Sequence, residues 1–255
     1  MNRDRLKKLA GDNRFIPGIY NYCDRWCERC PQTSRCLNFS ISEEEFSDPE
    51  TRDIRNEAFW NKLSGIFGET LELLREGAKK WGIELEALGS IDDIEDIKAK
   101  DVAVKNHLLC RAAKRYSEWV EDWFKGRETL FFEMAAAARE GVRLEEAIEV
   151  IRWYQYFIAA KVMRAIRGKM EEEEEERCDE FPSDSDGSAK IALIAIDRSI
   201  AAWAVIEHYI SDCNKEVMDV ITFLDGLRLA VEETFPNARS FIRPGFDRID
   251  LNGSS

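Results

Sequence analysis

Four cysteines near the start of the chain are the residues whose type and spacing most clearly predict chemistry. They are Cys23, Cys27, Cys30 and Cys36, and they follow the pattern C-x3-C-x2-C-x5-C. Four thiolates so close together suit an iron–sulfur cluster or a tetrahedral Zn²⁺ ion. The spacing therefore predicts that these four residues are metal and cofactor ligands.

The compactness of this segment favours iron over zinc. Structural zinc sites often use two cysteine pairs that a longer loop separates, whereas all four thiols here come from one short stretch of chain. We therefore expect a [4Fe–4S] cluster, with Zn²⁺ as the alternative. Ordering of residues 15–40 would depend on the bound metal, because this stretch is aromatic but has no helical or strand periodicity.

The part from Cys27 to Cys36, CERCPQTSRC, resembles the cluster-binding segment of RecB-type nucleases, in which a [4Fe–4S] cluster staples the fold. It is also similar to the cysteine run of auxiliary cluster domains in radical-SAM enzymes. The whole chain looks like helical bacterial proteins with such a cysteine head, a resemblance that implies no activity.

The activities of these enzyme families do not carry over. The nuclease core needs strands that bear Asp and Glu-x-Lys, and no strand is predicted. Radical-SAM enzymes usually have an aromatic residue where this chain has Arg29. A fourth nearby cysteine would also fill the iron position that SAM requires.

Asp197, His208 and Glu149 are weaker candidates for catalytic residues. Asp197 and His208 are eleven residues apart, so they share one face of a predicted helix, with Ala201 and Ala204 between them. They could line a buried acid–base pocket. The interpretation we favour is an interhelical stripe in which Asp197 pairs with an arginine.

The other cysteines and histidines do not form a recognisable site in the sequence. Cys110, Cys178 and Cys213 are interpreted as ordinary thiols. A carboxylate-bridged di-metal site would need Glu-x-x-His, but valine stands three residues before both His107 and His208.

Helical periodicity dominates the rest of the chain and predicts an all-α fold, a bundle of six or seven helices with an irregular N-terminal extension. Gly and Pro are scarce, and no proline lies between Pro49 and Pro182. Apolar stripes indicate helices over about 60–81, 102–126, 129–140, 144–170, 189–211 and 216–234. The expected organisation is a cysteine-rich segment (1–42), a helical bundle (43–236) with an acidic linker (171–188), and an irregular tail (237–255).

Charge and hydropathy narrow the possible partners. The 255 residues carry a net charge of −13, which disfavours bulk binding to nucleic acid or anionic membranes. The first 14 residues contain no apolar signal region, and the longest apolar stretch is too short to span a bilayer. These features predict a cytoplasmic protein without a membrane partner.

Three functions remain open from the sequence. The first is a helical iron–sulfur protein whose cluster serves electron transfer, redox sensing or structure, with a protein or redox partner. The second is a zinc-stabilised helical module for protein interaction. The third is a helical-bundle enzyme with a buried Asp/His pocket. Whether the chain is an enzyme is left open.

Overall fold

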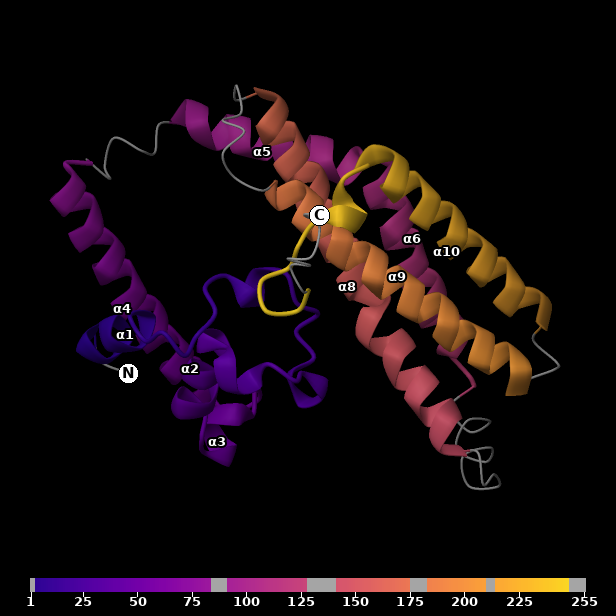
Figure 1. Ribbon diagram of the computed structural model, residues 1–255, viewed down its shortest axis with the longest axis horizontal. Helices are drawn as coiled ribbons and strands as arrows, with labels where there is room; N and C mark the ends of the chain where they lie inside the picture. The colour runs from indigo at the N-terminus through magenta and orange to yellow at the C-terminus, as the bar shows by residue number, and fades with distance from the viewer. Residues whose placement is uncertain (1–2, 84–90, 128–140, 175–182, 210–213, 248–255) are drawn as a thin grey trace, which may run out of the picture. The chain divides into compact units, whose positions relative to one another are not determined.

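The computed structural model describes residues 3–83, 91–127, 141–174, 183–209 and 214–247 (Figure 1). Every regular element in these ranges is an α-helix or a short 3-10 turn, and none is a strand. The predicted all-α fold class is therefore confirmed. Within the same ranges, no helix is long and apolar enough to cross a membrane.

The chain divides into two compact units. The first comprises Met1–Lys98 together with Arg243–Ser255, and the second comprises Ala99–Ile242. The domains expected from the sequence follow composition, whereas this division follows packing, so the boundaries fall at different places. The C-terminal residues in particular belong to the same unit as the cysteine segment.

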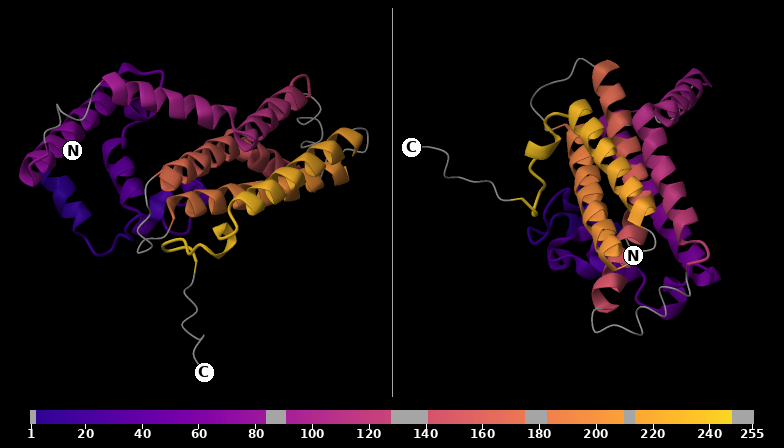
Figure 2. Two further views of the ribbon diagram at one scale, coloured as in Figure 1. Left: turned by 90° about the horizontal axis from the view of Figure 1, so that it is seen from above. Right: turned by 90° about the vertical axis from the view of Figure 1, so that its right-hand side faces the viewer.

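Most of the described part of the second unit consists of α6 (Leu108–Phe124), α8 (Gly141–Glu174), α9 (Asp184–Tyr209) and α10 (Asn214–Thr234). They run alongside one another in both orientations of the ribbon (Figures 1 and 2). Helix α9 packs against α8 and α10, and α8 also packs against α6. This arrangement encloses nearly all of the fully buried apolar side chains among the described residues.

An aromatic cluster fills the centre of this bundle. Trp203 is fully buried and its indole N–H donates to the hydroxyl of Tyr116 at 3.1 Å. The ring of Trp123 meets Trp203 edge-on, with 4.8 Å between centroids. Such rings bury large areas, and edge-to-face pairs add roughly 0.5–1.5 kcal/mol beyond area burial. The second unit therefore has its own stable core.

A helix break at His107 was not predicted. The sequence suggests one apolar stripe from Val102 to Trp123, but the structure separates α5 (Ile91–Asn106) from α6. His107 is the N-cap of α6, and its Nδ1 accepts a hydrogen bond from the Leu109 backbone N–H at 3.2 Å. This capping bond satisfies a donor that the new helix would otherwise leave unpaired.

The predicted acidic linker 171–188 is shorter in the structure. Helix α8 continues to Glu174, and α9 already begins at Asp184. Ser183 caps α9, because its hydroxyl accepts from the Asp186 backbone N–H at 3.1 Å and donates to Glu172 Oε1 at 2.7 Å. Small residues at the start of α9 also pack closely on α8, and a Cβ on Gly168 would lie 3.3 Å from Ser185. Small and polar residues at 183–188 therefore form the buried N-terminus of α9 instead of the end of the predicted linker.

The first unit contains α1 (Arg3–Ala10), α2 (Leu37–Glu45), α3 (Pro49–Arg52) and α4 (Glu57–Trp81). Helix α4 ends as predicted at Gly82, which adopts a left-handed conformation with φ of 70°. Its N-terminal half is held by an ion pair between Lys62 Nζ and buried Glu45 Oε2 at 2.6 Å. A ring contact between Phe46 and Phe59 lies beside this ion pair.

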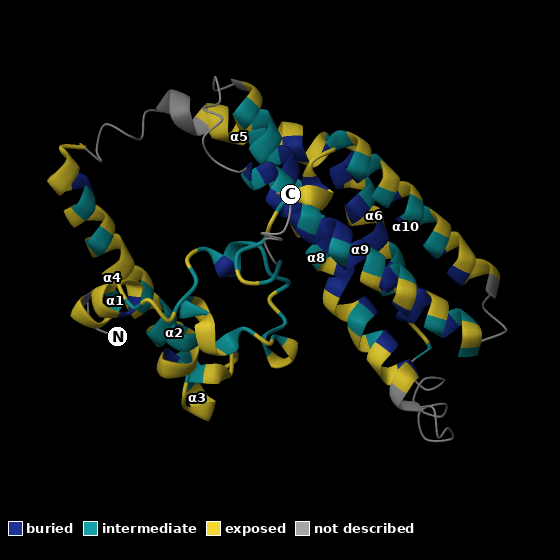
Figure 3. Cartoon of the chain, in the orientation of Figure 1, coloured by how far each residue is buried: buried dark blue, intermediate teal, exposed yellow. Residues whose placement is uncertain are grey.

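The first unit has a much smaller core than the second. In its described part, the fully buried apolar residues are Leu9, Ile19 and Ala78 alone. The apolar stripe predicted on α4 is present, but most of its residues are exposed. Much of that helix is accordingly coloured yellow in Figure 3. The predicted helix at 129–140 and the thiols Cys178 and Cys213 lie outside the described residues.

Candidate metal centre

Short 3-10 turns position the cysteines of the head. One turn covers Cys27–Arg29, and the Cys30 backbone N–H donates to the Cys27 carbonyl at 3.2 Å. The next covers Thr33–Arg35, and the Cys36 N–H donates to the Thr33 carbonyl, also at 3.2 Å. Each turn reverses the chain within three residues. These turns therefore bring the cysteines around one shared pocket, although the residues between them are too few to form separate helices.

The loop between Cys23 and Cys27 is closed by local hydrogen bonds. Asp24 Oδ1 accepts from the Trp26 backbone N–H at 3.2 Å, and the Cys27 N–H donates to the Arg25 carbonyl at 3.1 Å. Among the described residues, Arg25 is the sole non-glycine residue with positive φ, at 60°. Such a backbone costs about 1–2 kcal/mol for an L-residue. The loop is therefore held in a specific conformation rather than a relaxed one.

All four predicted ligands line one small pocket. Cys23, Cys27, Cys30 and Cys36 are free thiols and each is half-buried. Apolar and aromatic side chains complete the walls, among them Ile19, Tyr20, Trp26, Phe39 and Phe246. The structure thus brings together the complete set of cysteines that the sequence selects.

Backbone N–H groups point at two of these sulfurs. The Gln32 N–H donates to Cys30 Sγ at 3.4 Å, and the Phe39 N–H donates to Cys36 Sγ at 3.5 Å. The second bond also caps α2, whose N-cap residue is Cys36. Such donors stabilise negative charge on sulfur, so they suit thiolates that bind a metal.

The thiols also interact electrostatically. Burial raises the pKa of Cys27, and negative charge on Cys23, Cys36 and Cys30 raises it further. Four thiolates would therefore repel one another unless a cation lay between them. Nevertheless, in the part of the chain that is described, no three His, Cys, Asp or Glu side chains are placed to hold a single metal ion.

A segment from the C-terminus closes one side of this pocket. We call residues 243–247 the strap. Phe246 lines the pocket, and the carbonyl of Gly245 accepts from Gln32 Nε2 at 2.9 Å. Arg243 and Asp247 join the two ends of the strap through an ion pair at 2.8 Å. The sequence predicts an irregular tail here and does not reveal this contribution to the pocket. Its signal in the sequence is the aromatic residue after Pro244-Gly245.

The predicted catalytic candidates are not brought together in a pocket. Asp197 Oδ2 forms an ion pair with Arg239 at 2.6 Å, and Arg228 approaches Oδ1 at 3.7 Å. The Asp197 hydrogen bond raises the pKa of Arg239. His208 and Glu149 are exposed. These positions support the favoured interpretation of Asp197 as an arginine partner.

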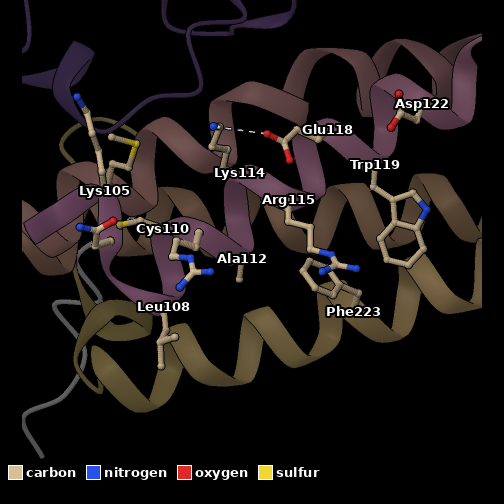
Figure 4. Close-up of a pocket in the computed structure, with 13 residues that line it drawn as sticks. Lys105, Leu108, Cys110, Ala112, Lys114, Arg115, Glu118, Trp119, Asp122 and Phe223 are labelled. Atoms are coloured by element: carbon tan, nitrogen blue, oxygen red, sulfur yellow. Dashed lines mark ion pairs between the residues drawn. The ribbon is translucent and has the colours of Figure 1, made fainter. Parts of the chain in front are cut away.

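A separate open groove lies between α6 and α10 (Figure 4). Its floor includes Trp119 and Phe223, whose ring centroids are 5.7 Å apart. Lys114 and Glu118 pair across one turn at its rim, at 3.5 Å. Cys110 lies at one end, and burial raises the pKa of its thiol to about 11. A thiol with so high a pKa is a poor nucleophile at neutral pH.

No family model, curated protein or solved structure matches this chain. The local resemblance to cluster-binding segments therefore stays a prediction. The cysteine pocket is the feature of this chain that bears most directly on its function.

Proposed function

We propose that the four cysteines of the head hold a [4Fe–4S] cluster and that the protein is a helical iron–sulfur protein of the cytoplasm. The observation that carries this proposal is the shared pocket of Cys23, Cys27, Cys30 and Cys36. Four thiolates are the usual ligand set of such a cluster.

A cluster and a single zinc ion need different separations between the sulfurs. A tetrahedral zinc site with Zn–S bonds of about 2.3 Å draws its sulfurs to within about 3.8 Å of one another. A cubic cluster carries its four cysteines on the outside of the cube, so its ligands surround a larger volume. The pocket lined by all four thiols does not choose between these two arrangements. The preference for the cluster comes from the compact spacing of the four cysteines in the sequence.

The surroundings of the pocket support a redox or structural role. With four thiolate ligands no iron is left open for a substrate, so the cluster would transfer an electron, sense redox state or fix the head. Half-burial leaves the cysteines near the surface, within reach of a redox partner. Arg25 and Arg29 are exposed beside them, and the Arg29 guanidinium lies 4.1 Å from the Trp26 ring. A partner with an acidic surface would complement these charges.

Zinc is the second candidate because of one local feature. The Cys27–Cys30 turn, with a backbone N–H donated to the second sulfur, is also suited to one half of a zinc site. In that case the head would be a metal-stabilised surface for protein binding.

Metal analysis of the full-length protein purified without oxygen tests both candidates. We expect about four iron and four sulfide per chain, with broad visible absorbance that dithionite bleaches. Zinc without iron would replace the first proposal by the second. Neither metal, in protein that also fails to take up iron and sulfide on reconstitution, would overturn both.

Single substitutions test the ligand set. Serine at position 23, 27, 30 or 36 should remove most of the metal, whereas Cys110→Ala, Cys178→Ser and Cys213→Ser should retain it. The second unit has its own core, so the far-ultraviolet circular dichroism of each variant should remain helical. Loss of metal in a control variant would mean that the ligand set is wrong.

A further inference from the structure

Helix α4 carries an apolar stripe that no other described part of the first unit covers. It follows a seven-residue repeat, which keeps side chains on one face of a helix. Its large members, with their exposed fractions, are Trp60 (53%), Phe67 (65%), Leu71 (50%), Leu74 (62%) and Trp81 (75%). A contiguous face of this size on a soluble protein marks an interaction surface. We call these five residues the α4 stripe.

Four of the five residues of the stripe are arranged symmetrically about the midpoint of the span from Trp60 to Trp81. Reversing the helix about this point, between residues 70 and 71, exchanges Trp60 with Trp81 and Phe67 with Leu74. The same operation exchanges two small residues on this face, Ser64 and Gly77. At these positions a large residue meets a large one and a small residue meets a small one, whereas Leu71 lies next to the axis and is exchanged with Thr70. A second, antiparallel copy of the same helix therefore fits the stripe.

Charge along α4 favours the same occupant and the same direction. On one side of this midpoint, residues 57–70 contain two glutamates and one lysine, whereas on the other side residues 71–81 contain two glutamates and three basic residues. The first part is therefore net acidic and the second net basic. A parallel pair would place the two acidic halves together and the two basic halves together. An antiparallel pair places the acidic half of one helix beside the basic half of the other, and it also opposes the two helix dipoles.

We propose that this chain forms a two-fold homodimer in which α4 pairs antiparallel with α4 of a second copy. A two-fold interface uses the same patch on both copies, as the symmetric stripe requires. If each large side chain buries about 100 Å² more, two copies bury about 1,000 Å², which is the lower limit for a specific interface. The proposal does not depend on the metal.

Sedimentation of the full-length protein over a range of concentrations tests the dimer. We expect a reversible dimer, and the double variant Phe67→Glu/Leu74→Glu should raise its dissociation constant by about a hundredfold or more. Both residues are exposed in the single chain, so helicity should be unchanged. Leu229→Glu is the matched control, because this residue is also exposed (55%) but lies on α10. A monomeric wild type, or a dimer that the double variant leaves intact, would overturn the proposal.

Disulfide mapping tests the direction of pairing without relying on disruptive variants. In the antiparallel register, position 64 lies opposite position 77 of the other copy and about 20 Å from its own equivalent. A mixture of Ser64→Cys and Gly77→Cys proteins should therefore crosslink through these positions, whereas Ser64→Cys alone should not. The glycine site tolerates a Cβ, which would meet the Trp81 ring at 3.9 Å. Crosslinking of Ser64→Cys with itself would indicate a parallel pair and refute the antiparallel one, and an absence of crosslinks in every sample would place the interface elsewhere.

Discussion

Gln32 and Gly245 are 213 residues apart in the chain, yet the side-chain amide of Gln32 donates to the Gly245 carbonyl at 2.9 Å. Gln32 lies between the third and fourth cysteines, so this bond attaches the strap directly to the cysteine loop. The strap also brings Phe246 to the pocket wall. The C-terminal segment is therefore part of the candidate metal centre.

Gly245→Ala should loosen the strap. Gly245 has φ of 77°, and a Cβ there would lie 2.6 Å from Ile16 Cδ1 and 2.9 Å from Ile19 Cδ1. The clash adds to the cost of a left-handed backbone, so we expect a loss of about 2–4 kcal/mol in the stability of the first unit. Faster release of metal to a chelator would report it.

Gly82→Ala is the control for that substitution. Gly82 has a similar φ of 70°, but a Cβ there meets no atom within 4 Å. It should cost about 1–2 kcal/mol for the backbone alone and leave the rate of metal release unchanged. Equal effects of the two substitutions would mean that the strap does not pack against Ile16 and Ile19.

Local patterns were sufficient to predict much of the fold and the grouping of the four cysteines. The apolar repeat of α4 and its terminal Gly82 predict that helix, and the spacing of Cys23 to Cys36 predicts the residues of the pocket. These features depend on neighbours in the sequence. The strap depends instead on one hydrogen bond and one aromatic contact across most of the chain, which no local pattern encodes.

The sequence also predicts an apolar stripe without saying what covers it. Trp60 and Trp81 have the spacing of core residues, yet both are exposed. Periodicity shows that a helix has an apolar face, but it does not distinguish a partner inside the chain from one outside it. The helix break at His107 was not predicted for a different reason. Histidine is not among the common N-cap residues, so nothing in the sequence indicates that a helix begins there.

His107→Ala should destabilise the second unit by about 1 kcal/mol, because the N-terminus of α6 loses its side-chain cap. His107→Asn should restore most of that stability, since a short amide oxygen can accept the same Leu109 N–H. Urea unfolding followed by circular dichroism measures both changes. If both variants were equally unstable, the imidazole would be needed for packing rather than for capping.

Cys110 should resist alkylation in the native protein. Burial raises the pKa of its thiol to about 11, so at pH 8 only about 0.1% is thiolate, compared with about a quarter of an ordinary thiol. We expect modification by iodoacetamide to be at least about a hundredfold slower than in urea, and to accelerate about tenfold per pH unit below pH 10. Peptide mass spectrometry measures each cysteine separately. Rapid alkylation in native protein would show that the end of the α6–α10 groove is open to Cys110.

Tyr116 should make the second unit less stable at alkaline pH. Burial raises the pKa of its hydroxyl to about 12, whereas an unfolded tyrosine ionises near pH 10. Between these values the unfolded chain releases a proton that the native protein retains. The free energy of unfolding therefore falls as pH rises, by up to about 2.7 kcal/mol once pH exceeds both pKa values, and this contribution is fully present at neutral pH.

A comparison of the wild type with Tyr116→Phe isolates this effect from the titration of other groups. The variant removes the acceptor of the Trp203 indole N–H, so at pH 8 it should be about 1–2 kcal/mol less stable than the wild type. At pH 11 the wild type alone carries the ionisation penalty of about 1.4 kcal/mol, and the difference should shrink by that amount or change sign. Urea unfolding at the two pH values measures both differences. A difference that stays constant would show that Tyr116 ionises as an exposed tyrosine does, which would contradict its central position between α6 and α9.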